Sequence, residues 1–151
     1  MSAVDTKELS GLELLRWVQS ERPAGFPAIQ QLFGLTFETV DPGRMVVSVA
    51  TRPEFGNTMG TVHGGVLATL LDTAMSCAVH TTLPAGVGYT TLEIKVNYVR
   101  AAHTDGRLLT TEGVVVHAGR RTATAEGRVT DAEGRLIAHA STTCLILDKA
   151  S

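Results

Sequence analysis

The stretch from Asn57 to His80 constrains the fold more than any other part of the chain. It reads NTMGTVHGGVLATLLDTAMSCAVH, a polar turn and a His-Gly-Gly followed by a segment that is apolar on almost every side of a helix. The few polar residues of that segment recur three or four positions apart and therefore share one narrow stripe. They are Thr69, Asp72, Thr73, Ser76 and His80. A helix with this pattern, predicted over about residues 63–82, should be wrapped by the rest of the chain.

Length and composition are those of one ordinary globular domain. The chain has 151 residues, of which 44% are hydrophobic and 19% charged. The formal net charge is −2 and the Lys and Arg residues are dispersed, which argues against nucleic acid as a partner. No apolar run approaches the roughly 18 residues of a membrane span, and the first residues lack the apolar core of a secretion signal. We therefore expect a cytoplasmic protein without a membrane or nucleic-acid partner.

The two cysteines, Cys77 and Cys144, form no CxxC pair and have no metal-ligand spacing around them. We interpret both as buried, reduced thiols. The histidines outside the His-Gly-Gly are scattered and are assigned to surface or core positions: His80, His103, His117 and His139. The sequence therefore offers no metal site.

Strand patterns lie on both sides of the predicted helix. Segments 35–41 and 45–51 alternate and are rich in β-branched residues, and Pro42-Gly43 between them predicts a hairpin. Four longer strand candidates follow the helix, at 88–101, 107–119, 121–132 and 135–147. Turn signals between the last of these strands predict an antiparallel meander.

Two details of these strands give expectations for side-chain burial. In the segment 88–101, every second residue is apolar, and we expect these residues on a buried face. They are Leu92, Ile94, Val96 and Tyr98. Gly113, inside the following strand, predicts a bulge or a bend.

The order of the elements predicts an α+β fold, a curved antiparallel sheet of about five or six strands wrapped around one central helix. Residues 1–34 carry a short amphipathic helix within 8–20 and a second helical piece that ends at Gly34. We expect them to form an N-terminal helical extension that packs on the main fold as a lid or flank. Residues 35–148 are then a single domain.

His63, Gly64 and Gly65 open the predicted helix. The first backbone N–H groups of a helix lack intrahelical partners, and the helix dipole favours negative charge beside them. Such a helix end can stabilise the oxyanion of a carbonyl under attack, and losing one donor costs on the order of 100- to 1000-fold in rate. The alternative interpretation is that the glycines only permit tight packing and that His63 only caps the helix.

Asp72 lies eight residues beyond Gly64, which is about 12 Å along a helix at roughly 1.5 Å per residue. One thioester or ester carbon cannot contact both groups. If both serve one reaction, the carboxylate of one subunit must meet the helix end of another, which predicts a two-fold dimer with shared sites. The alternative is a structural carboxylate that bonds to Ser76 one turn further on, or to the backbone.

The residues of this stretch resemble the motif of the hotdog-fold acyl-CoA thioesterases, in particular the phenylacetic acid degradation (PaaI-type) branch and its hydroxybenzoyl-CoA thioesterase relatives. The motif is N-x-x-G-x-x-H-G-G and then, after six further residues, an acid. In this chain it consists of Asn57, Gly60, His63, Gly64, Gly65 and Asp72. The resemblance covers about residues 35–148, implies a hotdog fold and leaves the N-terminal extension outside.

The resemblance implies a role for each motif residue. Asp72 would be the catalytic carboxylate, acting either as a general base on water or as a nucleophile through an anhydride. Gly64 or Gly65 would donate its N–H group to the thioester carbonyl. Asn57 and His63 would position the carbonyl or the water. By the family's arrangement, Asp72 comes from one subunit and the other residues come from its neighbour.

The resemblance also implies contacts with the substrate. Ser76 matches a hydroxyl position that orients water or substrate, and Thr91 lies on the strand expected to line the acyl tunnel. Arg is well suited to bidentate contact with phosphate, and Arg100, Arg120 and Arg121 match places where relatives direct basic residues toward the CoA nucleotide. The alternative is that these arginines are solvated turn residues. Many relatives have Arg-Pro where here Arg100 is followed by alanine, so the local path toward the nucleotide is expected to differ.

The sequence thus predicts hydrolysis of an acyl-CoA, with an aromatic or a short to medium-length acyl group, to the free acid and CoA without a metal or redox cofactor. The expected partners are the acyl-CoA substrate and further copies of the chain, as a dimer or a dimer of dimers. A non-catalytic acyl-CoA-binding hotdog module is one alternative, against which Asp72 argues. A hydratase or dehydratase is another, but its D-x-N-P-x-H or His-Phe-Pro stretches are absent. The N-terminal helix either caps the acyl tunnel or covers an outer sheet edge.

Overall fold

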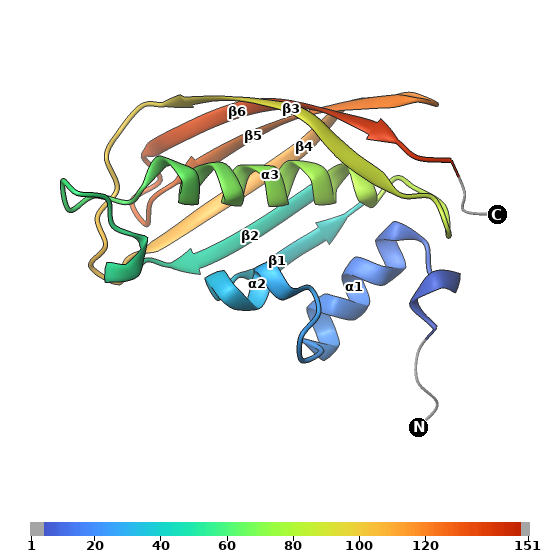
Figure 1. The fold of residues 1–151 in the computed structure, drawn as a ribbon, viewed down its shortest axis with the longest axis horizontal. Coiled ribbons are helices and arrows are strands. Elements are labelled where there is room, and N and C mark those ends of the chain that lie inside the picture. The colour runs from blue at the N-terminus through green and yellow to red at the C-terminus, as the bar shows by residue number, and fades with distance from the viewer. Residues whose placement is uncertain (1–4, 149–151) are drawn as a thin grey trace.

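The computed structural model describes residues 5–148 and shows an α+β fold in which a six-stranded sheet curls around one long helix (Figure 1). The helices are α1 (Gly11–Glu21), α2 (Ala28–Phe33) and α3 (Gly64–His80), with short 3₁₀ turns at Thr6–Glu8 and Pro53–Phe55. The strands are β1 (Thr36–Asp41), β2 (Arg44–Ala50), β3 (Tyr89–Tyr98), β4 (Leu108–Ala118), β5 (Thr122–Thr130) and β6 (Leu136–Ile146). The predicted fold class, central helix, strands and N-terminal helices are confirmed.

The sheet has the strand order β1-β2-β4-β5-β6-β3, and each neighbouring pair is antiparallel. The β1–β2 hairpin precedes α3 in the chain, whereas β3 follows α3 and pairs with β6 on the far side of the sheet. The helix therefore crosses the inner face of the curled sheet, as Figure 1 shows, and β1 and β3 form the two edges.

The side of α3 that faces the sheet fills the core of the protein. Its side chains lie among buried residues of β2, β4, β5 and β6, and the following are fully buried: Leu70, Leu71, Ala74, Met75 and Ala78. The side that carries Asp72 stays partly exposed. Although α3 is largely apolar, none of the helices within residues 5–148 is long and apolar enough to cross a membrane.

Gly113 marks a close approach between the helix and the sheet, and the bulge considered for this position is not observed. The register of β4 runs without a shift through Gly113, which lies opposite Gly127 of β5, and the irregularity falls later, between Val115 and His117. A Cβ atom at Gly113 would lie 2.4 Å from the carbonyl carbon and oxygen of Ala74 in α3. The absence of a side chain therefore lets α3 rest directly on β4.

Side chains of α1 cover the β1 edge of the sheet. Arg16 donates from Nε to the carbonyl oxygen of Val40, at 3.1 Å. Gln19 donates from Nε2 to the carbonyl oxygens of Phe37 and Glu38, each at 3.0 Å. The first helix thus occupies acceptors that an added strand would use, which matches the expectation that it covers an outer edge. Within the described residues, β3 remains the open edge.

A bulge in β3 overturns part of the expected burial of this strand. The register with β6 shifts between Thr91 and Glu93, and an extra residue at such a bulge reverses which side chains face the core. Leu92 therefore points outward and is 55% exposed, and Tyr98 at the strand end is 54% exposed. The expected burial is therefore wrong for both residues, for Leu92 because of the bulge and for Tyr98 because it lies at the strand end, on the same face as Ile94 and Val96. Ile94 and Val96 pack against the core as expected.

Candidate active site

The first turn of α3 presents one backbone N–H group that is free of a partner. His63 is the N-cap residue, and its Nδ1 atom accepts a hydrogen bond from the N–H of Gly65 at 2.9 Å. The carbonyl oxygen of His63 accepts from the N–H of Val66, also at 2.9 Å. Among residues 5–148, no acceptor bonds to the N–H of Gly64. The capping role considered for His63 is therefore observed, and Gly64 carries the available donor.

Tyr98 of β3 covers this turn from the side. Its hydroxyl donates to the carbonyl oxygen of Gly64 at 2.9 Å. A Cβ atom at Gly64 would lie 3.0 Å from the Cζ atom of Tyr98 and 3.2 Å from its hydroxyl oxygen, so the ring tip packs directly on the glycine. Tyr98 was not expected at the site, because the strand alternation assigned it to the core.

Asn57 closes the loop that leads into α3. Its Oδ1 atom accepts from the backbone N–H groups of Met59 and Thr61, at 2.9 and 3.2 Å, and its Nδ2 atom donates to the hydroxyl of Thr61 at 3.0 Å. An Asx arrangement of this kind sets the local chain path. Within the protomer, the side chain of Asn57 therefore shapes the entrance to the helix.

Asp72 lies on the partly exposed side of α3 and is held by the neighbouring strand. Its Oδ1 atom accepts a hydrogen bond from the hydroxyl of Thr91 in β3 at 2.8 Å. Ser76, one turn further on, instead accepts from the hydroxyl of Tyr89 at 3.4 Å. The alternative in which Ser76 is the partner of Asp72 is thus not observed. Thr91, expected among the substrate contacts, is placed to orient the carboxylate.

The separation between the helix end and the carboxylate follows from the continuity of α3. Gly64 and Asp72 belong to one uninterrupted helix, so they lie about 12 Å apart along its axis. Each is tied to β3, Gly64 through Tyr98 and Asp72 through Thr91. Both groups therefore line the same side of the protomer, beside the open edge of the sheet, but they do not meet within one chain.

Burial shifts the pKa values of ionisable side chains around the C-terminal end of α3. Burial raises the pKa of the Cys77 thiol to about 12. Burial also raises the pKa of the Cys144 thiol, and both cysteines are free. The ring of His80 lies 5.1 Å from that of Tyr89, and burial lowers the pKa of this histidine. The expectation of buried, reduced thiols is confirmed for Cys144, whereas Cys77 is free but only half-buried. Both thiols are protonated at neutral pH.

The three candidate arginines fall into two groups at opposite ends of the sheet. Arg100 follows the end of β3 that pairs with Ala138, whereas Arg120 and Arg121 precede the end of β5 that pairs with Leu145. Ala138 and Leu145 are seven residues apart on β6, about 23 Å at roughly 3.3 Å per residue. A single protomer therefore does not bring the three arginines together.

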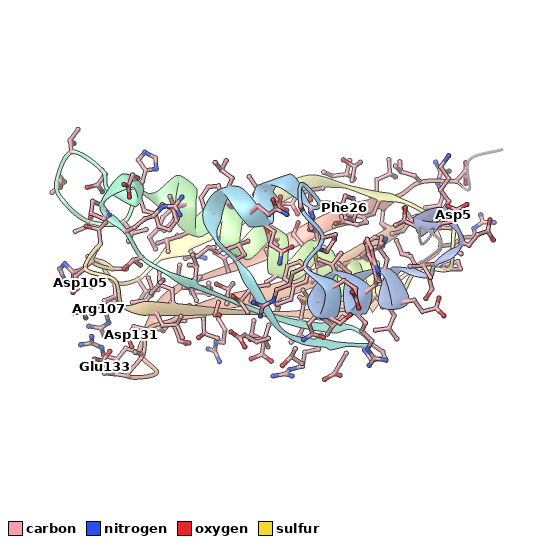
Figure 2. The ribbon with its side chains drawn as sticks, turned by 90° about the horizontal axis from the view of Figure 1, so that it is seen from below. Asp5, Phe26, Asp105, Arg107, Asp131 and Glu133 are labelled. Carbon is pink, nitrogen blue, oxygen red and sulfur yellow. The ribbon has the colours of Figure 1, made fainter. Side chains whose placement is uncertain are left out.

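A pocket of about 420 Å³ lies beside Arg100 and is lined by charged residues of the sheet end. Arg107 pairs with Asp105 at 2.6 Å, and Arg135 pairs with Asp131 at 2.7 Å. Figure 2 shows Asp105, Arg107 and Asp131 gathered at this end of the molecule. Arg100 has no ion pair within the described part of the chain, so its charge is available to an anion. No group of three or more His, Cys, Asp or Glu side chains in residues 5–148 is arranged to hold a metal ion.

Fold and site together define a class of proteins in which a curled antiparallel sheet wraps one helix, with a free helix N-terminus and a mid-helix carboxylate on the same side. Residues 59–138 match the family model described as the thioesterase superfamily. Because this match spans more than half of the chain, the protein belongs to that superfamily.

Individual relatives agree with this assignment. A predicted esterase of Halobacterium salinarum is 34% identical over 98 residues, which is 62% of this chain and 63% of that protein, so the match spans less than two thirds of the relative. The PaaI protein of the phenylacetic acid degradation operon of E. coli superposes with a TM-score of 0.79 over 89% of this chain and 94% of its own, at 20% identity. A hypothetical thioesterase of Streptococcus pneumoniae, solved with coenzyme A, is 30% identical with a TM-score of 0.71, over 78% and 88% of the two chains. The predicted hotdog fold and PaaI-type resemblance are confirmed.

Proposed function

We propose that the protein is an acyl-CoA thioesterase in which Asp72 activates water or attacks the thioester, and the Gly64 N–H group binds the carbonyl oxygen. The observation that carries the proposal is the pairing of these two groups on one side of α3. Asp72 is held by Thr91, and the Gly64 N–H is the available donor of the helix end. The coenzyme A bound to the Streptococcus pneumoniae relative supports CoA as the leaving group.

The chemistry follows from these two groups. As a general base, Asp72 takes a proton from a water molecule while the water oxygen bonds to the thioester carbon. The negative charge that develops on the carbonyl oxygen is stabilised by the Gly64 N–H and the helix dipole. The C–S bond then breaks, and the CoA sulfur takes up the proton. As a nucleophile, Asp72 would bond to the thioester carbon itself and the C–S bond would break, releasing the CoA thiolate. Water would then hydrolyse the anhydride to the free acid and the Asp72 carboxylate, and the proton released would pass to the thiolate.

The site requires two copies of the chain. Antiparallel pairing along the open edge of β3, about a two-fold axis near Ile94 and Lys95, would set Tyr98 of one copy opposite Thr91 of the other. Because Tyr98 contacts Gly64 and Thr91 contacts Asp72, this register brings the helix end of one protomer to the carboxylate of its neighbour.

The same register unites the separated arginines. The Tyr89 end of β3 pairs with Ile146 of β6, whose N–H donates to the carbonyl oxygen of Arg121. In the antiparallel pair, Arg100 of the neighbour would lie beside this end, near the β4–β5 turn. A basic cluster from two chains would then be available to the CoA phosphates.

The proposal is tested by replacing Asp72 with Asn and measuring thiol release from short, medium, long and aromatic acyl-CoAs. Asparagine keeps the shape and can still accept from Thr91, so the fold should persist while turnover falls by roughly 100-fold or more. Glu21→Gln removes an exposed carboxylate of α1 and serves as the matched control, with wild-type turnover expected.

Two results would contradict this assignment. Wild-type turnover in Asp72→Asn would remove the carboxylate from the mechanism. Binding of acyl-CoAs to the wild-type protein without release of thiol from any of them would favour the alternative of a binding module.

A further inference from the structure

The helix end at the proposed site is built from residues that do not hold a helical turn by themselves. Gly64 and Gly65 are the first two residues of α3, and glycine loses more backbone freedom in a helix than any other residue. The Gly64 N–H group must nevertheless keep one direction to be useful to a thioester oxygen, because a preorganised donor costs no reorganisation during the reaction. Contacts from outside the turn must therefore hold the two glycines in one backbone conformation.

Two side chains provide such contacts, from two different elements. His63 caps the turn from the loop, through the bond from the Gly65 N–H to its Nδ1 atom. Tyr98 holds the turn from β3, through the bond from its hydroxyl to the Gly64 carbonyl oxygen. The two bonds lie on the C=O and N–H sides of the same peptide group, which joins Gly64 to Gly65. A hydrogen bond at the carbonyl also polarises the N–H of that group.

The fit between Tyr98 and Gly64 is specific to a glycine. A Cβ atom at position 64 would lie within 3.3 Å of three atoms of the Tyr98 ring tip and would push the ring away. The hydroxyl proton of Tyr98 is engaged by the backbone carbonyl of Gly64. The direct consequence of this bond is to hold Gly64 in place.

We propose that Tyr98 is a positioning residue that fixes the Gly64–Gly65 turn, so that the Gly64 N–H is aimed at the thioester carbonyl oxygen. This inference rests on the proposed thioesterase function. It adds a residue of β3, the strand expected to pair with the neighbouring subunit, to the support of the helix end. Tyr98 then links the pairing of the two β3 strands to the orientation of the Gly64 N–H group.

The variant Tyr98→Phe tests the inference, because it keeps the ring over Gly64 and removes only the hydroxyl. Its matched control is Thr82→Val, which removes a hydroxyl that bonds to the carbonyl oxygen of Val79 at 2.7 Å, at the opposite end of the same helix. We expect kcat of Tyr98→Phe to fall roughly tenfold, the scale of one neutral hydrogen bond, with KM within about twofold of wild type. The shape of the pH profile should not change, because Asp72 is untouched, and Thr82→Val should behave as wild type.

A second measurement does not depend on turnover. In protein labelled with ¹⁵N-glycine, the amide proton of Gly65, which bonds to His63 Nδ1, should exchange with solvent faster in Tyr98→Phe than in wild type or Thr82→Val. Unchanged kcat or unchanged exchange at Gly65 in Tyr98→Phe overturns the positioning role, as does an equal loss of kcat in Thr82→Val. If the wild-type protein releases no thiol from any acyl-CoA, the proposed function fails and the role of Tyr98 fails with it.

Discussion

Single polar residues inside this protein differ in whether the fold gives them a partner. Thr142 in β6 is buried, and its hydroxyl donates to the carbonyl oxygen of Glu93 at 2.7 Å. Thr111 in β4 is fully buried, yet its hydroxyl has no hydrogen-bond partner among residues 5–148. A buried polar group without a partner costs free energy that an apolar side chain of the same shape does not.

Replacing Thr111 with Val should therefore stabilise the protein. Valine has nearly the same shape, so we expect the free energy of unfolding in urea to rise by about 1 kcal/mol. Thr142→Val is the matched control, and it should lower that free energy by about 1 kcal/mol because it leaves the Glu93 carbonyl without its donor. A loss of stability in Thr111→Val would show that the hydroxyl is not an unpaired group in solution.

His80 should make stability depend on pH in the mildly acidic range. Burial lowers its pKa from the ordinary value of 6.5, so the folded protein binds a proton less readily than the unfolded chain does. The contribution of neutral His80 to the free energy of unfolding is therefore fully present above about pH 6.5. It is lost as the pH falls through the pKa that His80 has in the folded protein. Between pH 7 and pH 5, the unfolding free energy of His80→Gln should decline less steeply than that of wild type. Substitution of the exposed His139 by Gln should leave the wild-type slope unchanged.

At the scale of secondary-structure elements, the position of α3 depends on glycines in the sheet. Gly113 brings β4 against the backbone of Ala74, and Gly127 of β5 leaves room for Met75, whose Cγ would lie 2.8 Å from an added Cβ. Neither contact follows from strand propensity, since glycine weakens a strand. The glycines place α3 close enough to the sheet for Asp72 and Gly64 to reach β3.

Replacing Gly113 with Ala should force α3 away from β4. The added methyl group would meet backbone atoms that cannot rotate away, and overpacking of this kind costs about 1–3 kcal/mol. Gly88→Ala is the control, because its Cβ would make ordinary contacts of 3.5 Å with Leu147. Thermal unfolding should show a lower midpoint for Gly113→Ala only. Equal midpoints for the two variants would mean that the helix does not rest on Gly113.

At the scale of the whole molecule, our proposal requires two chains to complete one site. The β1 edge is occupied by side chains of α1, which leaves β3 as the open edge beside both halves of the site. The arrangement predicts that two inactive chains can restore one another when each supplies a different half.

Mixing Asp72→Asn and Gly64→Pro protomers tests this complementation. Proline removes this N–H group, and its Cβ atom would also displace the ring tip of Tyr98, so both effects disable the helix-end half of the site in the same chain. Proline is favoured at the first position of a helix, and His63 before it already has the extended backbone that a proline requires. Each variant alone should be nearly inactive. After unfolding and joint refolding in equal amounts, about half of the dimers carry one complete site, so thiol release should return to about one quarter of the wild-type rate. No recovery in a mixture shown to contain mixed dimers would place both groups in one chain or remove one of them from the mechanism.

Most of the fold could be predicted from local patterns in the sequence. The apolar surface of residues 64–80 and the alternation of the flanking segments predicted the central helix and the six strands, since period and turn chemistry are local properties. The prediction failed where an extra residue changed the period. The bulge after Thr91 turned Leu92 outward, and β3 (Tyr89–Tyr98) contains no glycine or proline that would have signalled it.

The amino-acid sequence alone was enough to predict the helix that opens with His-Gly-Gly, the acid within it and, through the helical rise, a separation of about 12 Å that one chain cannot close. Which side chains support these groups follows from the packing of the folded chain. Thr91 bonds to Asp72, which lies 19 residues earlier in the chain, and Tyr98 bonds to Gly64, which lies 34 residues earlier. Such contacts depend on the curl of the sheet, the bulge in β3 and the close packing of α3 on Gly113. These features arise from packing between segments that are distant in sequence, so no local sequence periodicity predicts them.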